Sequence, residues 1–391
     1  MQEAYIVAGL RTAVGKAKKG GFRFTRPDDL AVETIRQLLA TVPALEPQHV
    51  DDLIVGNAVP EAEQGLQIGR MIAVRALPMN VPGMTVNRYC ASGLETIAIA
   101  TAKIRAGMAD CIIAGGTESM SLVPTVGWKT VPNYTVSKST PEYYLGMGLT
   151  AEAVANEYNV SREDQDIFSY QSHKKAINAI TNGYFKNQIA PVTVEDVTVN
   201  AKGKRETKSY IVDTDEGPRA DTSLEVLSKL KPVFAAKGSV TAGNSSQTSD
   251  GAAFTIVMSE RMCKHYNIKP IARLVSCGSA GVHPRIMGIG PVEAVPIALK
   301  QAGLKLKDID LIELNEAFAS QSIAVIRTLG INPEIVNVNG GAIALGHPLG
   351  CSGAKLTIQL IHELNRRGKK RGIVTACVGG GQGIAGVIEV M

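Results

Sequence analysis

Residues 51–57 read DDLIVGN and residues 309–315 read IDLIELN, and both segments end in an asparagine. When the two are aligned, a similar phrase follows each of them: IAVRALPMN from Ile72 and IAVIRTLGIN from Ile323. Similar phrases that recur in the same order indicate an internal repeat. We therefore expect this chain of 391 residues to contain two halves that share one fold.

Each half continues with a short strand, a helix that opens at a Ser-Gly pair and ends near a glycine, and a further strand. These elements are predicted at 84–87, 92–107 and 111–116 in the first half and at 335–339, 352–368 and 373–381 in the second. Helices that alternate with strands indicate parallel pairing with right-handed crossovers. The sequence therefore predicts an α/β protein made of two βαβαβ-type halves related by a pseudo-two-fold axis.

The region between the halves, 119–245, is less regular. It contains Pro- and Ser/Thr-rich loops, a helix with Ser161 as its N-cap and Gly183 at its end, and a hairpin-like stretch of mixed charge. We expect this insertion to lie over both halves and to shape a binding site. The predicted division is an N-terminal half of 1–118 plus 246–268, an insertion of 119–245, and a C-terminal half of 269–391.

Composition excludes several classes of protein. Apolar residues make up 45% and charged residues 20%, which is typical of a globular protein in water, and no run of about 18 apolar residues suggests a membrane helix. A net charge of +5 without a long basic run gives little support to nucleic acid binding. The six cysteines form no Cys-x-x-Cys pair, so we expect neither a disulfide scaffold nor a metal site. A cytoplasmic protein is the expectation.

Cys90 is the first candidate for catalysis because it lies between a predicted strand and a predicted helix. Unpaired N–H groups and the dipole at a helix start favour negative charge, so the pKa of this thiol is predicted to fall. A strand-to-helix turn would also present the sulfur outward. The alternative is a buried structural thiol, but this placement favours a nucleophile.

Three further residues complete the candidate site. His347 lies in GGAIALGHPLG, a glycine-rich insertion without a counterpart in the first half, and the pseudo-symmetry should bring it towards Cys90 as a base. Cys377, before three glycines, is either a core thiol or a proton donor and acceptor. Asn315 is either a helix cap or a residue that holds a water or an oxyanion. Its repeat mate Asn57 is expected to be structural.

Several phrases together resemble the thiolase family, and the resemblance runs essentially from end to end. They are VNRYCASGLETI, GGTESMS, AGNSSQTSDGAA, ELNEAFA, NVNGGAIALGHPLGCSGAK and CVGGGQG. The resemblance implies a duplicated fold of five layers, αβαβα, with an inserted loop domain. It also implies that Cys90 is acylated by the substrate, that His347 activates it, and that Cys377 is the acid and base at the α-carbon.

The resemblance implies further contacts with the substrate. A water on Asn315, together with Nε2 of His347, would stabilise the enolate, and the N–H groups of Cys90 and Gly379 would form a second oxyanion hole. Residues implied to contact coenzyme A or the acyl chain are Arg219 at the nucleotide, Ser246 at the pantetheine, Phe234 and Phe318 as apolar walls, and Met147 in the acyl pocket. No cofactor is implied, since coenzyme A is itself a substrate.

Within the family the phrases MGLTAE and MSLVP are more similar to degradative members, and Gly146 stands where biosynthetic members carry a histidine. The expected reaction is cleavage of 3-ketoacyl-CoA by CoA to acetyl-CoA and a shorter acyl-CoA, in fatty acid β-oxidation. A homodimer or homotetramer is implied, with a hydratase/dehydrogenase as partner.

Three alternatives remain open at this point. The chain is a biosynthetic acetoacetyl-CoA thiolase, a ketoacyl synthase, or a non-catalytic acyl-CoA or lipid-binding protein of the same fold. Ketoacyl synthases combine a cysteine with two histidines, whereas the third position here is Cys377. A non-catalytic protein would be free to lose catalytic residues, yet all four are present.

Overall fold

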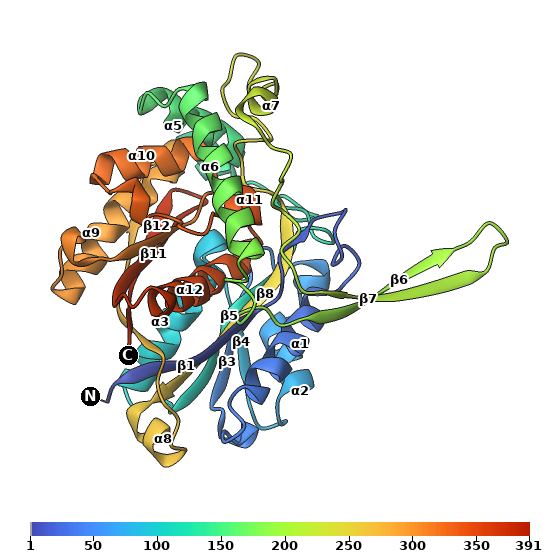
Figure 1. Ribbon diagram of the computed structural model, residues 1–391, viewed down its shortest axis with the longest axis vertical. Coiled ribbons are helices and arrows are strands. Elements are labelled where there is room, and N and C mark those ends of the chain that lie inside the picture. The colour runs from blue at the N-terminus through green and yellow to red at the C-terminus, as the bar shows by residue number, and fades with distance from the viewer. Residues whose placement is uncertain (1) are drawn as a thin grey trace.

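The computed structural model describes residues 2–391 and shows a mixed α/β protein with a long central sheet (Figure 1). The strands are β1 (Ala4–Arg11), β2 (Gly15–Lys16), β3 (Asp52–Gly56), β4 (Gly83–Val86), β5 (Cys111–Ser119), β6 (Val192–Val199), β7 (Arg205–Val212), β8 (Ser249–Ser259), β9 (Ala272–Gly281), β10 (Leu311–Leu314), β11 (Arg371–Val378) and β12 (Gln382–Val390). The helices are α1 (Pro27–Ala40), α2 (Ile68–Ala76), α3 (Ser92–Arg105), α4 (Tyr134–Ser139), α5 (Met147–Glu157), α6 (Arg162–Thr181), α7 (Leu224–Ser228), α8 (Glu260–His265), α9 (Gly290–Ala302), α10 (Ala319–Leu329), α11 (Ala342–Leu345) and α12 (Leu349–Arg366).

The order of the strands reveals the internal repeat. The N-terminal half has the order β4-β3-β5-β8-β1, and the C-terminal half has the order β10-β11-β12-β9, with β9 joined to β1. β3 is parallel to β4 and β5, and β10 is parallel to β11. β8 and β12 each run antiparallel to both neighbours. The two halves therefore repeat one pattern outward from the β1–β9 junction, as the repeated phrases predict.

The strand predicted at 335–339 is wrong, because this segment makes only a single bridge, between Val336 and Ile312. Asn337 adopts a left-handed φ of 44°, and its side chain replaces the missing pairing. Its Oδ1 accepts from the N–H of Leu314 at 2.8 Å, and its Nδ2 donates to the carbonyl of Leu314 at 2.8 Å. A side-chain amide offers both a donor and an acceptor, so it competes with a regular strand ladder.

Five layers follow from how the helices cover the sheet (Figure 1). α3 and α12 lie in the middle, where their apolar side chains share one core with strands of both halves. α1 and α2 cover the outer face of the N-terminal half, and α9 and α10 cover that of the C-terminal half. The layers run helix, sheet, helix, sheet, helix, which agrees with the predicted αβαβα arrangement.

The two central helices touch through the glycines of their Ser-Gly pairs. A Cβ atom at Gly93 would lie 2.7 Å from the backbone N of Ala354, and one at Gly353 would lie 2.2 Å from the backbone N of Leu94. Real Cβ atoms do not approach a backbone so closely, so only glycine fits at either position. The repeated glycines are therefore explained by the contact between the two halves.

The predicted start of one central helix needs correction. α3 begins at Ser92 as predicted, but α12 begins at Leu349, three residues before Ser352. Pro348 is the N-cap, and the N–H of Ser352 already donates to its carbonyl at 2.9 Å. The first turn is therefore formed by residues that the sequence pattern assigned to the glycine-rich loop.

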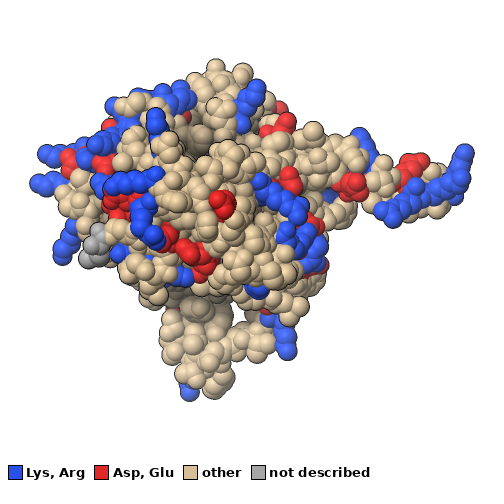
Figure 2. Space-filling view, turned by 90° about the horizontal axis from the view of Figure 1, so that it is seen from below, with Lys and Arg blue, Asp and Glu red and all other residues tan. Residues whose placement is uncertain are grey.

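The insertion contains α4 to α7 and a hairpin formed by β6 and β7. Ser161 caps α6 by accepting a hydrogen bond from the N–H of Asp164 at 3.0 Å, and Gly183 follows the helix with a φ of 70°, both as predicted. The hairpin projects away from the body, and Lys and Arg side chains gather towards its tip (Figures 1 and 2). Among residues 2–391, no helix has both the length and the apolar character that crossing a bilayer requires.

Candidate active site

Cys90 lies in a short 3-10 turn, Tyr89–Ala91, that connects β4 to α3. Tyr89 has a φ of 44°, in the left-handed region that non-glycine residues rarely adopt. Ser92 braces the turn, because its Oγ accepts from the N–H of Arg88 at 2.9 Å and donates to the carbonyl of Tyr89 at 2.7 Å. Strained turns of this kind are found where a side chain must be presented for chemistry.

The protonation of Cys90 differs from the prediction. The residue is half-buried, and burial raises the pKa of its thiol to about 11. The backbone N–H groups of Gly379 and Cys90 oppose this rise, and the carboxyl group of Glu118 adds to it. The predicted fall in pKa is therefore wrong, because the loss of hydration raises the pKa by more than the start of the helix lowers it. The raised pKa makes Cys90 a neutral thiol near pH 7.

Cys377 and Gly379 reach the same place from the end of β11. Cys377 is fully buried, and the pKa of its thiol is raised by burial and further by the nearby sulfur of Cys90. Two residues later, the backbone N–H of Gly379 is near enough to the sulfur of Cys90 to lower the pKa of that thiol. Gly380 and Gly381 then turn the chain into β12 with φ values of 79° and 86°. The structure therefore brings Cys90, Cys377 and Gly379 together.

Asn315 and His347 form a second pair. Asn315 directly follows β10, and its Nδ2 lies 3.3 Å from Nε2 of His347. The N–H of His347 donates to the carbonyl of Gln247 at 3.1 Å and lies 3.2 Å from Oγ of Ser249. Burial lowers the pKa of His347 to about 3, and the positive charge of Lys355 lowers it further in the same direction. The imidazole is therefore neutral near pH 7.

Glu118, to which the sequence analysis assigned no role, connects the N-terminal half to the segment that follows His347. Its Oε2 accepts hydrogen bonds from the N–H of Ala58 at 2.8 Å and from the N–H of Gly350 at 2.8 Å. Glu118 thus fastens the first turn of α12, just after His347, to the N-terminal half. Leu349 of this turn packs with Ala58 in a small apolar cluster that Cys90 also contacts. The segment after His347 therefore lies beside Cys90, as the pseudo-symmetry predicts.

Ser352 is the other residue that sequence analysis missed as part of the site. Its Oγ lies 2.5 Å from Nδ1 of His347, on the side of the ring opposite Asn315. In the sequence, the repeated Ser-Gly pair indicates only the start of a helix. Nothing in the pattern of residues around Ser352 indicates that its hydroxyl faces the imidazole of His347.

Four of the five residues predicted to contact the substrate lie around the same groups. Sδ of Met147 is 3.7 Å from where a Cβ at Gly379 would stand, and Met147 and Phe318 pack in one apolar cluster with Cys377. Phe234 meets Phe318 edge to face, with ring centres 6.1 Å apart. The N–H of Ser246 donates to the carbonyl of Ala317, the residue before Phe318, at 2.9 Å.

Arg219 lies on an exposed loop of the insertion. Its guanidinium is 3.8 Å from the carboxylate of Asp221, and both side chains are largely exposed. Its backbone N–H donates to Nδ1 of His173 at 3.2 Å. The structure thus shows an exposed cation and no contact of this side chain with the groups around Cys90.

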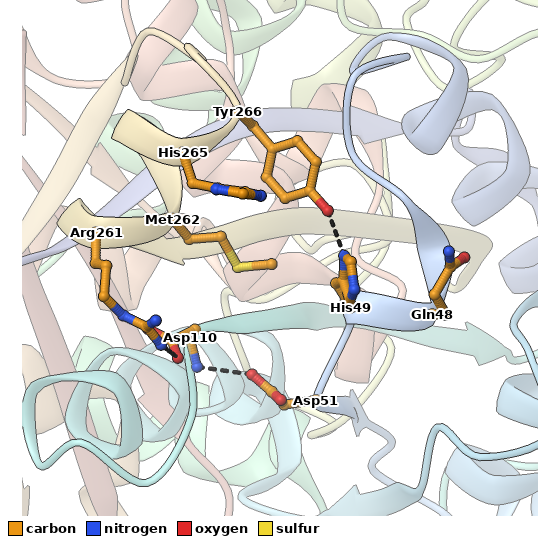
Figure 3. Close-up of a pocket in the computed structure, with 8 residues that line it drawn as sticks. All are labelled: Gln48, His49, Asp51, Asp110, Arg261, Met262, His265 and Tyr266. Carbon is orange, nitrogen blue, oxygen red and sulfur yellow. Dashed lines mark hydrogen bonds and ion pairs between the residues drawn. The ribbon is translucent and has the colours of Figure 1, made fainter.

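A surface pocket of about 370 Å³ lies elsewhere on the molecule (Figure 3). It is lined by residues that precede β3 and β5 and by residues of α8 and its C-terminal end, among them His49, Asp51, Asp110 and Tyr266. Cys90 and Asn315, by contrast, follow the carboxyl ends of β4 and β10. This pocket is therefore separate from the candidate site. Among residues 2–391 no group of three or more metal-ligating side chains is found.

Comparison with known proteins gives one consistent family. The model described as "Thiolase, N-terminal domain" matches residues 4–261, and "Thiolase, C-terminal domain" matches residues 268–390. The chain is 54% identical over 391 residues to a 3-ketoacyl-CoA thiolase of Bacillus subtilis (strain 168), with 100% of both chains covered. It is 44% identical over 400 residues to an acetyl-CoA acetyltransferase of Pseudomonas aeruginosa, with 98% of each covered.

Solved structures agree with this result. The crystal structure of human mitochondrial 3-ketoacyl-CoA thiolase matches with a TM-score of 0.88 and 39% identity, covering 100% of this chain and 99% of the other. The crystal structure of the Bacillus anthracis acetyl-CoA acetyltransferase matches with a TM-score of 0.90 and 38% identity, with the same coverage.

Proposed function

Since the chain belongs to the thiolase family and is an acyltransferase, we propose that it is a degradative enzyme that cleaves 3-ketoacyl-CoA with CoA. Three observations support this proposal: Cys377 lies near Cys90, Asn315 faces His347, and Leu349, two residues after His347, packs in one apolar cluster with Cys90. The products are acetyl-CoA and an acyl-CoA that is two carbons shorter. The names of the related thiolases indicate that those proteins act on acyl-CoA substrates.

In the first half of the reaction, the sulfur of Cys90 attacks the 3-keto carbon while Nε2 of His347 takes the thiol proton. The bond between the α- and β-carbons then breaks, which leaves acyl-Cys90 and the enolate of acetyl-CoA. The thiol of Cys377 gives its proton to the α-carbon. Acetyl-CoA leaves, and Cys377 remains as a thiolate.

In the second half, the thiol of CoA loses its proton to Cys377 and attacks the acyl group on Cys90. The sulfur of Cys90 leaves and recovers its proton from His347, so both groups return to their starting states. The N–H of Gly379, which faces the sulfur of Cys90, is suited to stabilise the negative oxygen that forms at the acyl carbon. One such donor contributes on the order of 3 kcal/mol to transition-state stabilisation.

The degradative subtype is supported by the space beside Met147. A Cβ atom at Gly146 would meet no other atom within 4 Å. Where biosynthetic members carry a histidine, this chain has an exposed glycine, and the next residue in the chain is Met147. An open position here suits an acyl chain longer than four carbons. The biosynthetic alternative is supported by the similarity to acetyl-CoA acetyltransferases.

Turnover assays decide between these functions. Purified enzyme is given CoA and 3-ketoacyl-CoA substrates of four to sixteen carbons, and the loss of the 3-keto thioester is followed by absorbance. The degradative proposal predicts comparable or higher kcat/KM on the longer substrates than on acetoacetyl-CoA. Activity confined to the four-carbon substrate would contradict it, and Cys90→Ala should abolish turnover on every substrate.

The proposal also covers the compartment, the number of subunits, the pathway and a partner enzyme. We place it in the cytoplasm as a homodimer or homotetramer, in fatty acid β-oxidation, where a hydratase/dehydrogenase partner supplies the 3-ketoacyl-CoA. Size-exclusion chromatography with light scattering measures the subunit number directly. Co-purification with a 3-hydroxyacyl-CoA dehydrogenase activity tests the partner.

A further inference from the structure

The imidazole of His347 is held from both sides by groups of known hydrogen-bonding capacity. Oγ of Ser352 lies 2.5 Å from Nδ1 and 2.9 Å from the carbonyl oxygen of Pro348. On the other side, Nδ2 of Asn315 lies 3.3 Å from Nε2. All three side chains are buried, with exposed fractions of 4% for His347, 2% for Ser352 and 1% for Asn315.

The contacts of Ser352 bear on where the ring proton resides. A serine hydroxyl has one hydrogen, and a carbonyl oxygen can only accept. Ser352 lies four residues after Pro348 in the first turns of α12, where a serine hydroxyl commonly donates to that carbonyl. With its hydrogen committed there, Oγ offers only lone pairs to Nδ1. Nδ1 must then carry the ring proton and donate to Ser352.

The contact of Asn315 selects the same arrangement independently. The amide nitrogen of an asparagine is a donor and has no lone pair to offer. A neutral imidazole carries one proton, so the nitrogen that faces this donor is the unprotonated one. If Nε2 were protonated instead, two donors would face each other in a buried site, which is costly. The contacts of Ser352 and Asn315 therefore both favour the tautomer of His347 with hydrogen on Nδ1.

We propose that Ser352 is a positioning residue that fixes His347 in the tautomer with hydrogen on Nδ1. The lone pair of Nε2 is then free to take the thiol proton of Cys90. When the proton arrives, Nε2–H becomes a donor towards the substrate oxygen, while Ser352 continues to accept from Nδ1–H. This inference rests on the proposed function, because it assigns Ser352 its effect through the base of that reaction.

The tautomer is measured directly by nuclear magnetic resonance on the full-length enzyme labelled with ¹⁵N-histidine. Long-range ¹H–¹⁵N correlations distinguish a protonated from a bare ring nitrogen, and His347→Asn identifies the His347 signal by its loss. The wild-type enzyme and Ser352→Thr should both show a protonated Nδ1 and a bare Nε2 at pH 7. A protonated Nε2 in the wild-type enzyme would overturn the proposal.

Kinetics test the consequence. Ser352→Ala should lower kcat about 10- to 100-fold, as loss of a residue that orients a catalytic group usually does, with KM within about twofold of the wild type. Ser352→Thr should restore most of the rate. The matched control is Ser169→Ala on α6, which removes an equivalent buried hydroxyl-to-carbonyl bond, 2.7 Å to Gln165, away from His347. This control should keep kcat within about twofold.

The outcomes separate the two proposals. Wild-type kcat in Ser352→Ala overturns the positioning role. If that variant does not fold, the resonance experiment on the wild-type enzyme and on Ser352→Thr decides. A wild-type enzyme without thiolytic turnover contradicts the proposed function, whereas the position of the ring proton is read from the spectrum regardless of turnover.

Discussion

At the scale of single residues, burial decides the charge of the reacting groups. Burial raises the pKa of Cys90 to about 11 and lowers that of His347 to about 3, so both are uncharged near pH 7. An ion pair of thiolate and imidazolium is therefore not the resting state. In the proposed reaction, the proton moves from Cys90 to His347 as the substrate carbonyl receives the sulfur.

Alkylation kinetics test the neutral thiol. Because only the thiolate reacts, the rate of iodoacetamide labelling of Cys90 should rise about tenfold per pH unit between about pH 7 and 9, below the pKa of about 11. Mass spectrometry of the peptide that contains residue 90 gives the rate, and Cys90→Ser shows the labelling of other thiols. A rate that levels off below about pH 8 would indicate a thiolate and contradict the prediction.

The open position at Gly146 predicts a change in substrate range. In Gly146→His, the imidazole should occupy the space beside Met147 that an acyl chain needs. We expect kcat/KM to fall about tenfold or more on substrates of eight or more carbons, with about twofold change on acetoacetyl-CoA, since a lost apolar contact is worth about 1–3 kcal/mol. Gly146→Ala is the control and should keep the profile. An unchanged profile in Gly146→His would show that acyl chains bind elsewhere.

At the scale of elements, the contact between α3 and α12 sets how closely the halves approach. α3 carries the turn of Cys90 at its start, and α12 begins just after His347. A displacement of one helix against the other would therefore change the distance between Cys90 and His347. Gly93 and Gly353 therefore allow the two helices to pack closely, and this packing also sets the distance between Cys90 and His347.

Gly353→Ala tests this contact. The new Cβ would lie 2.2 Å from the backbone N of Leu94, and because backbone atoms cannot move aside cheaply, we expect a loss of about 3 kcal/mol or more in unfolding free energy. Urea denaturation measures the loss. Gly281→Ala is the control, because its nearest atom would be 4.0 Å away, and it should change stability by less than about 0.5 kcal/mol. Equal stability of the two variants would refute the close contact.

At the scale of the whole molecule, a buried ion pair attaches the insertion to the sheet. Arg11 of β1 bonds both carboxylate oxygens of Asp215 at 2.7 and 2.8 Å, and neither side chain is exposed. Asp215 lies after β7, on the segment that leads to Arg219. Burial alone would raise the pKa of Asp215, but the charge and hydrogen bonds of Arg11 hold it below its ordinary 3.8.

Replacing one partner of the Arg11–Asp215 ion pair should lower the free energy of unfolding more than replacing both. Asp215→Asn leaves the charge of Arg11 buried without its counterion, so unfolding free energy should drop by about 3–5 kcal/mol. The double variant Arg11→Met with Asp215→Leu should lose less than Asp215→Asn, since no charge is left uncompensated. Urea denaturation at pH 7 compares them. A double variant at least as destabilised as the single one would contradict this account.

The sign of the pH effect follows from the lowered pKa. Because the carboxyl group of Asp215 is held below its ordinary value of 3.8, its contribution to stability is complete above that pH and is lost as the pH falls through the lowered pKa. Below that range, wild type and Asp215→Asn should converge in stability. The urea midpoint measured against pH provides the test.

Much of the fold follows from local patterns in the sequence. The repeated phrases predicted two halves, and the strand order confirms them. Ser161 and Gly183 marked the ends of α6, because capping depends on residues only three or four positions apart. Cys90 was placed on a strand-to-helix turn for the same reason. Neighbouring residues determine such features, and the sequence contains those neighbours in order.

Features that depend on distant residues were decided by the tertiary structure alone. The segment 335–339 reads as a strand, yet Asn337 satisfies Leu314, 23 positions away, with its side chain. The pKa of Cys90 depends on how completely the surrounding atoms exclude water from the thiol. The residues next to Cys90 in the sequence do not determine this burial. Glu118 accepts a hydrogen bond from the N–H of Gly350, 232 positions away, and this contact exists only because the two halves meet. Local sequence patterns thus predicted most elements and the candidate reacting groups, whereas the distances and protonation of these groups were decided by packing, because both depend on residues that only the fold brings together.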